Sequence, residues 1–167
     1  MTNPPNGAVI RYYLAEEPES ELEVTLTFTD ASGDEVRSFS RNPENEDDPS
    51  LPAQAGMNQF VWDLTYPSLT VPEGKMNYMG YIGGPVVVPG EYLVTLTVGD
   101  WSSSEPLIVR QDPRLPHVTT AQLAELQELS FQVQDRISEA YHALETIASV
   151  RDQAKALAEN AKEGGFG

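Results

Sequence analysis

The chain contains no cysteine, only two histidines, and 10 lysines and arginines against 26 aspartates and glutamates. Without cysteine there can be no disulfide, no thiolate metal site and no cysteine nucleophile. The formal net charge of −16 repels phosphate groups, so we expect binding neither to nucleic acid nor to anionic membrane surfaces. No apolar run approaches the roughly 18–20 residues of a membrane span. The opening residues 1–5 have neither the basic nor the apolar part of a signal peptide.

The residue patterns that usually mark catalytic or metal sites are also missing. His117 and His142 stand alone, without a second histidine or a glutamate at metal-binding spacing, so we interpret both as surface residues. No serine lies in a Gly-x-Ser-x-Gly elbow. The segment 30–34 begins like a calcium loop but lacks the later glycine and glutamate, and we interpret it as a turn. We therefore expect no catalytic residue, no metal and no cofactor.

What the chain does contain is a series of short segments with the two-residue period of strands. Turn residues such as Pro89-Gly90 separate them. The expected strands cover residues 7–14, 24–29, 35–40, 58–63, 91–98 and 105–110. In 91–98 the alternation places Tyr92, Val94 and Leu96 inside and Leu93 outside, and Phe60 and Trp62 share one face of their strand. The pattern predicts an immunoglobulin- or fibronectin-like antiparallel β-sandwich over residues 1–114, so the fold class is mainly β.

Residues 115–167 differ in character and are predicted to form a long helical arm. Thr119 and Gln122 have the spacing of a capping box, and neither glycine nor proline occurs from there to Lys162. Twelve positions recur at alternating spacings of three and four, and ten of them are apolar: Leu123, Leu126, Ser130, Val133, Ile137, Ala140, Leu144, Ile147, Arg151, Ala154, Ala158 and Ala161. This is the heptad period of a coiled seam, which favours one half of a helical hairpin or a second copy of the chain.

We expect a weak homodimer through this seam, with Ile137, Ala140, Leu144 and Ile147 in the contact. The end of the helix is rich in alanine, which contributes little buried area, so fraying is expected after about Ala158.

Three tyrosines lie in or beside a long stretch rich in glycine and proline: Tyr66, Tyr78 and Tyr81. Exposed tyrosines of this kind can stack on a sugar ring or on a protein partner. They can also fold over the end of the sandwich, and this is the interpretation we favour. A ligand-binding role for these three residues is therefore the second of two interpretations.

Several segments together resemble a known family. They are Asn3–Leu14, Ala55–Leu64, Pro89–Leu96 and Val109–Arg114. In this order they look like the C-terminal region of bacterial BNR-repeat, sortilin-like propeller proteins, many of which are labelled glycosyl hydrolases. The Trp62-Asp63 and Pro89–Tyr92 pieces are also similar, more loosely, to the Ig-like domain of flagellar hook-capping proteins.

The resemblance implies an accessory domain of an exported, periplasmic or secreted protein, which braces an intramolecular propeller or binds a partner. The chain departs from the family in having no propeller, no Asp-box repeats and only one helix. Any hydrolase activity would belong to the missing propeller, so we expect this chain not to be an enzyme. The alternative function is a carbohydrate-binding module that uses the aromatics around 66–81 to hold a glycan.

Overall fold

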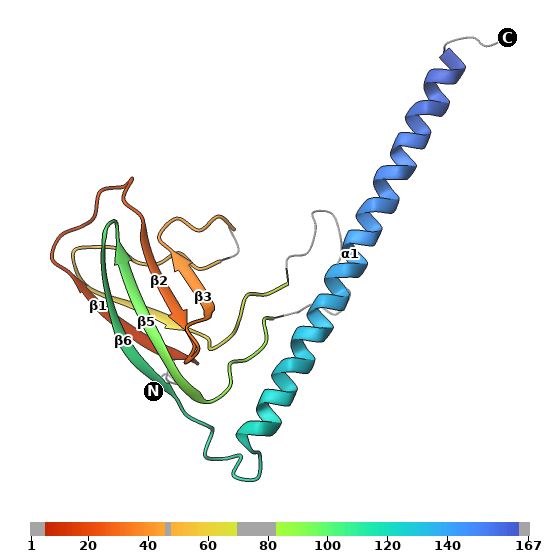
Figure 1. The fold of residues 1–167 in the computed structure, drawn as a ribbon. Coiled ribbons are helices and arrows are strands. Elements are labelled where there is room, and N and C mark those ends of the chain that lie inside the picture. Colours follow the sequence, from red (N-terminus) through yellow and green to blue (C-terminus); the bar gives the residue numbers. More distant parts are fainter. Residues whose placement is uncertain (1–5, 46–47, 70–82, 164–167) are drawn as a thin grey trace, which may run out of the picture. The chain divides into compact units, whose positions relative to one another are not determined.

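A computed structural model describes residues 6–45, 48–69 and 83–163 of the chain (Figure 1). Its elements, in chain order, are β1 (Ala8–Leu14), β2 (Val24–Thr29), β3 (Glu35–Ser40), β4 (Gly56–Trp62), β5 (Gly90–Val98), β6 (Trp101–Val109) and α1 (Thr120–Glu163). The fold is therefore mainly β with one long C-terminal helix, as the sequence predicts.

The chain divides into two compact units. The first contains Met1–Ser68 and Gly83–Gln127, and the second contains Leu69–Ile82 and Glu128–Gly167. All six strands belong to the first unit, and α1 begins in the first unit and continues into the second.

The strands form two antiparallel sheets. One has four strands in the order β3-β2-β5-β6, and the other pairs β1 with β4. The register of β2 against β5 places Leu26 opposite Leu96 and Phe28 opposite Val94. β2 alternates between buried and half-buried residues throughout, and β5 alternates from Tyr92 to Thr97, so the four-stranded sheet has one apolar inner face.

The core joins the inner faces of the two sheets. Trp62 of β4 is fully buried and stacks on Phe28 of β2, with their ring centroids 4.2 Å apart. Its ring also lies edge-to-face with that of Tyr92, with the two centroids 6.0 Å apart. Phe60 lies against Phe39 of β3 at 4.6 Å. The five core residues expected from the sequence, Phe60, Trp62, Tyr92, Val94 and Leu96, are all buried, and Leu93 is 41% exposed. The inward and outward assignment is confirmed.

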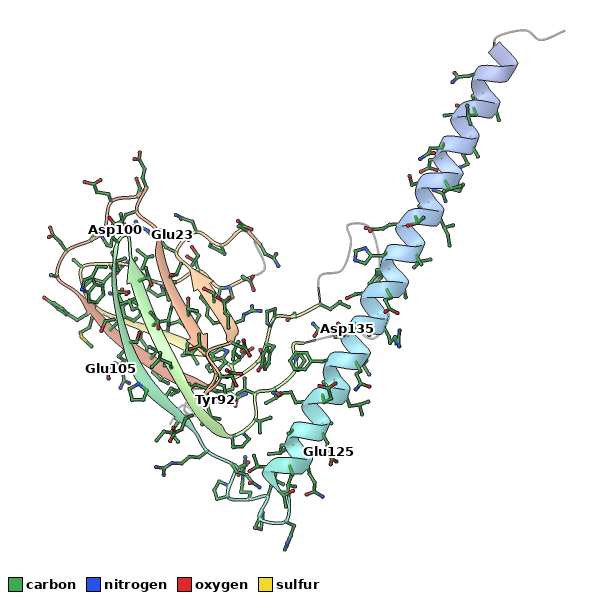
Figure 2. The ribbon with its side chains drawn as sticks, in the orientation of Figure 1. Glu23, Tyr92, Asp100, Glu105, Glu125 and Asp135 are labelled. Carbon is green, nitrogen blue, oxygen red and sulfur yellow. The ribbon has the colours of Figure 1, made fainter. Side chains whose placement is uncertain are left out.

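The last strand begins earlier than the sequence predicts. β6 starts at Trp101, not at residue 105. It pairs with β5 along its full length, and the pairing begins with Trp101 opposite Val98. Only Gly99 and Asp100 connect the two strands, and Gly99 has the positive φ of 55° that such a tight turn requires. Acidic side chains mark this hairpin and its surroundings, with Glu23 and Asp100 near the turn and Glu105 on the edge strand (Figure 2). β6 therefore forms a long exposed edge.

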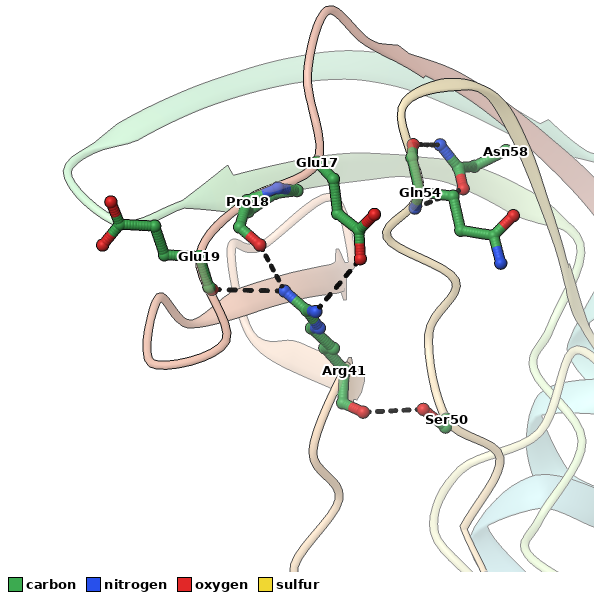
Figure 3. A network of polar contacts seen from close by, with 7 residues as sticks. All are labelled: Glu17, Pro18, Glu19, Arg41, Ser50, Gln54 and Asn58. Atoms are coloured by element: carbon green, nitrogen blue, oxygen red, sulfur yellow. Dashed lines mark hydrogen bonds and ion pairs between the residues drawn. The ribbon is translucent and has the colours of Figure 1, made fainter.

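Two polar side chains fix the loops of the first unit (Figure 3). Asn58, 5% exposed, donates through Nδ2 to the Gln54 and Gly56 carbonyls and accepts from the Gln54 N–H at 3.1 Å. Arg41 donates through Nη1 to the carbonyls of Pro18 (2.9 Å) and Glu19 (3.2 Å). Every buried side-chain polar atom of the described residues has a partner, as expected for a well-formed interior.

Burial of two tyrosines predicts alkaline destabilisation. Burial raises the pKa of Tyr12 and of Tyr92 to about 12, and their hydroxyls donate to the carbonyls of Pro52 and Val88. An unfolded tyrosine titrates near pH 10, so the folded state holds these protons more tightly. Their contribution to stability is complete below about pH 10 and is lost as the pH rises towards about 12.

We expect the urea midpoint of unfolding to fall between about pH 10 and about pH 12, and Tyr92→Phe to reduce that fall. Urea titrations of the parent, Tyr12→Phe and Tyr92→Phe at several alkaline pH values measure this fall. Identical pH dependence in the parent, Tyr12→Phe and Tyr92→Phe would show that these hydroxyls do not cause the effect.

The helix begins at the predicted capping box. The Thr119 N–H donates to Gln122 Oε1 at 2.9 Å, and the Gln122 N–H donates to Thr119 Oγ1 at 3.2 Å. α1 continues to Glu163. Fraying after about Ala158 stays a prediction, since end-fraying is a matter of dynamics. Within the described residues, no helix is long and apolar enough to cross a membrane.

Candidate functional site

The outer face of the β1–β4 sheet carries large exposed side chains where a strand with one buried face normally has polar ones. Tyr13 is 65% exposed, Met57 is 69% exposed and Val9 is 37% exposed. We call the outward residues of these two strands the β1–β4 outer face; they are Val9, Arg11, Tyr13, Met57, Gln59 and Val61.

The antiparallel register joins these six residues into one surface. Tyr13 lies directly opposite Met57, Val9 lies opposite Val61, and Arg11 lies opposite Gln59. Opposite residues in such a pair have their Cβ atoms about 4.5–5.5 Å apart, so the side chains touch across the strands. In the central pair, Arg11 Nε donates to Gln59 Oε1 at 3.2 Å. The result is a central polar pair with an apolar pair at each end.

The composition of this face is that of a binding surface. Tyrosine, methionine and arginine are enriched in protein–protein interfaces, and aspartate and glutamate are depleted. The β1–β4 outer face carries one arginine and no acid, although the chain as a whole has 26 acidic residues. Its lack of negative charge and its exposed apolar side chains distinguish it from the acidic loops around it.

The outer face of the four-stranded sheet is of a different kind. Its register aligns two rows of hydroxyl residues, namely Ser40-Thr25-Thr97-Ser102 and Ser38-Thr27-Thr95-Ser104. Thr27 and Ser38 share a hydrogen bond of 3.0 Å, and Thr95 and Ser104 share one of 2.8 Å. These small hydroxyls are bonded to one another, and the same face also carries the exposed apolar residues Leu93 and Ile108 beyond the two rows.

The loop aromatics predicted as ligand contacts are only partly described. Tyr66 is half-buried and packs against the core cluster, and burial, with Asp30 and Asp34 nearby, raises its pKa. This placement agrees with the interpretation that it folds over the end of the sheets. Tyr78 and Tyr81 lie outside the described residues.

The residues predicted for self-association do not have equal exposure. Ala140, Leu144 and Ile147 are exposed, with Leu144 at 48% and Ile147 at 64%, whereas Ile137 is half-buried.

The carboxylate-rich loops have structural roles. Asp30 Oδ1 accepts the N–H groups of Ser32 (2.8 Å) and Asp34 (3.0 Å), which confirms the turn interpretation of 30–34. Asp48 forms an ion pair with Arg37, which lies over the Phe39 ring at 5.1 Å. Among the described residues, no three histidines or carboxylates are grouped closely enough to hold a metal.

Sequence reasoning did not find Tyr13 and Met57, although a signal for them is present. In 7–14 the alternation places Tyr12 inside, so Tyr13 must point outward. Met57 precedes the buried Asn58 and points outward for the same reason. A tyrosine and a methionine at outward positions of two expected strands therefore indicate the exposed pair.

The comparisons with known proteins return nothing: no protein-family model, no curated protein and no solved structure matches the chain. The propeller-family resemblance therefore depends on the quoted segments alone.

Proposed function

We propose that the first unit is an immunoglobulin- or fibronectin-like β-sandwich that acts as a non-catalytic accessory domain of an exported BNR-repeat propeller protein. In this proposal the β1–β4 outer face binds the propeller and braces it. The observation that carries the proposal is the exposed cross-strand pair of Tyr13 and Met57 on an otherwise acidic molecule.

Two features support the sandwich part of the proposal. The inner faces of the two sheets share one aromatic core, in which Trp62 stacks on Phe28 across the interior. The hydroxyl of Tyr92, near the start of β5, donates to the carbonyl of Val88 four residues upstream at 2.6 Å. A tyrosine that bonds back to the backbone just before its own strand resembles the tyrosine corner of immunoglobulin-like domains.

The proposed binding role is argued from the domain order of the propeller family and from the exposed side chains of the β1–β4 outer face. The propeller family places its propeller before the segments that this chain resembles, so the propeller is the nearest large surface. Large aromatic and thioether side chains contribute most to interfaces when they are buried centrally. Tyr13 and Met57 are the two most exposed apolar residues of the β1–β4 outer face and are directly opposed, so they would form the centre of such a contact.

A titration calorimetry experiment tests this, with the chain titrated into the separately expressed propeller segment that the proposal assigns to the same protein. We expect saturable binding, and we expect the double variant Tyr13→Ser/Met57→Ser to raise Kd at least about 10-fold. Leu93→Ser/Ile108→Ser is the matched control, since Leu93 and Ile108 are exposed apolar residues on the other sheet.

If the folded chain does not bind the propeller segment, or if both double variants lose the same affinity for it, the assigned face is wrong. Glycan-array binding that is lost in Tyr78→Ala would instead support the carbohydrate-binding alternative.

A further inference from the structure

α1 carries a continuous row of exposed residues that the fold leaves uncovered. Its largest apolar members are Leu129 (55% exposed), Val133 (50%), Ile147 (64%), Val150 (60%) and Leu157 (71%). We call the whole row the 129–157 seam; it consists of Leu129, Val133, Arg136, Ala140, Ala143, Ile147, Val150, Ala154 and Leu157, all exposed. Its spacings alternate between four and three residues without interruption, which is the heptad period of a two-stranded coiled coil.

This seam is distinct from the side of the helix that is partly covered. Most half-buried positions of α1 follow the same spacings one residue later in the repeat, namely Leu123, Gln127, Ser130, Gln134, Ile137 and Tyr141, and Ala148 follows seven residues on. Phe131 and Ser138 are half-buried beside them. The seam differs from the one predicted from sequence as well. It shares Val133, Ala140, Ile147 and Ala154 with that prediction but contains Ala143 and Val150 in place of Leu144 and Arg151.

The residues of the seam discriminate between two orientations of a second copy. In a parallel, in-register pair every residue faces itself. Arg136 would then face Arg136 of the second copy, which places like charges together. Ala140 and Ala143 would also face themselves, which leaves two adjacent layers without a large side chain.

An antiparallel pair removes both conflicts. When Ala143 faces Ile147 of the second copy, the register places Ala140 opposite Val150 and Arg136 opposite Ala154. Small residues then face large ones in three layers, and Val133 faces Leu157 in the fourth. Alternation of large and small side chains fills a helix interface without voids.

The flanking positions agree with the same register. Glu139 would lie opposite Gln153 of the second copy, and Leu144, 48% exposed, would lie opposite itself at the two-fold axis. Arg136 keeps its ion pair with Glu139 of its own helix, in which Nη1 and Oε2 are 2.8 Å apart. No like charges face each other across the seam.

We propose that residues 129–157 of α1 form an antiparallel two-stranded coiled coil with a second copy of this chain, in the register that places Ala143 opposite Ile147. The contact is two-fold symmetric, so each copy uses the same surface. It depends on the helix alone and not on the proposed role of the β1–β4 outer face.

Sedimentation of the full chain over a wide concentration range tests the pairing. We expect a monomer–dimer equilibrium, and we expect Ala143→Glu to raise the dimer Kd at least about 100-fold because it buries a carboxylate in the seam. Ala156→Glu is the matched control, because Ala156 is exposed but does not belong to the seam. Both substitutions place a carboxylate four residues after an existing acid: Ala143 follows Glu139, and Ala156 follows Asp152. The control is expected to change Kd by less than about 3-fold.

Circular dichroism of both variants confirms that the helix is retained. A chain that stays monomeric at every concentration overturns the proposal, as does equal weakening by the two variants with the helix intact.

Spin labels decide the orientation, since the chain has no cysteine of its own. Gln132→Cys and Thr146→Cys are labelled in separate samples and the distance between the two copies is measured by pulsed electron resonance. The antiparallel register predicts a separation below about 20 Å at residue 146 and of about 40 Å at residue 132, because the helix rises about 1.5 Å per residue. Short distances at both positions would show a parallel pair and overturn the assigned register.

Discussion

Replacement of Trp62 by alanine is expected to lower the free energy of unfolding by about 3–5 kcal/mol. The ring is fully buried, stacks on Phe28 with an interplanar angle of 29°, and touches the edge of Tyr92. Its Nε1 donates to the Thr65 carbonyl at 3.0 Å, so the substitution also removes a hydrogen bond. Because the ring contacts strands of the opposite sheet, its loss leaves a cavity between the two layers.

Urea unfolding followed by far-ultraviolet circular dichroism measures this loss. Trp101→Ala is the control, because Trp101 is 56% exposed at the start of β6 and should cost less than about 1 kcal/mol. If Trp62→Ala unfolds at the urea concentration of the parent, the assignment of Trp62 to the core is wrong.

Replacement of Asn58 by alanine is expected to cost about 1–3 kcal/mol, because it removes three hydrogen bonds from a site that is 5% exposed. The amide holds the turn at Gln54–Gly56, where Gly56 has a φ of 98°. Without it, the chain before β4 loses its fixed entry into the sheet. Asn58→Asp keeps the acceptor and loses both donors, so it should be at least as damaging.

The neighbouring residue provides the comparison. Gln59→Ala, on the β1–β4 outer face, should change the free energy of unfolding by less than about 0.5 kcal/mol, since Gln59 is exposed. Equal stability of Asn58→Ala and Gln59→Ala would contradict the role given to the buried amide.

The strands with one buried face were predictable because burial leaves a two-residue period in the sequence. Residues 24–29 and 91–98 show that period and form β2 and the greater part of β5. Residues 35–40 do not, since their buried residues Val36 and Phe39 are three apart, and β3 was predictable only as the strand that follows the 30–34 turn. The start of β6 was not predictable in this way. Ser102, Ser103 and Ser104 are all exposed on an edge strand, so no alternation marks them, and their pairing follows from the tight turn at Gly99-Asp100.

The helix was predictable in type and in its start, but its seam was not. Alanines at 140, 143, 154 and 158 fit more than one heptad frame, so the sequence alone does not fix which frame is uncovered. Exposure in the structure selects the frame that contains Leu129, Val150 and Leu157. The candidate binding face was missed for a related reason: Tyr13 and Met57 are conspicuous only after the pairing of β1 with β4 brings them together.

Hydroxyl-radical footprinting of the chain, with and without the propeller segment proposed as its partner, tests the proposed binding face most directly. Met57 and Trp101 are both exposed and both react readily, and they lie on different sheets. The account predicts that the propeller slows oxidation of Met57, together with Tyr13, and leaves Trp101 unchanged. Unchanged oxidation of Met57 in a saturated complex, or protection of Trp101 alone, would contradict it.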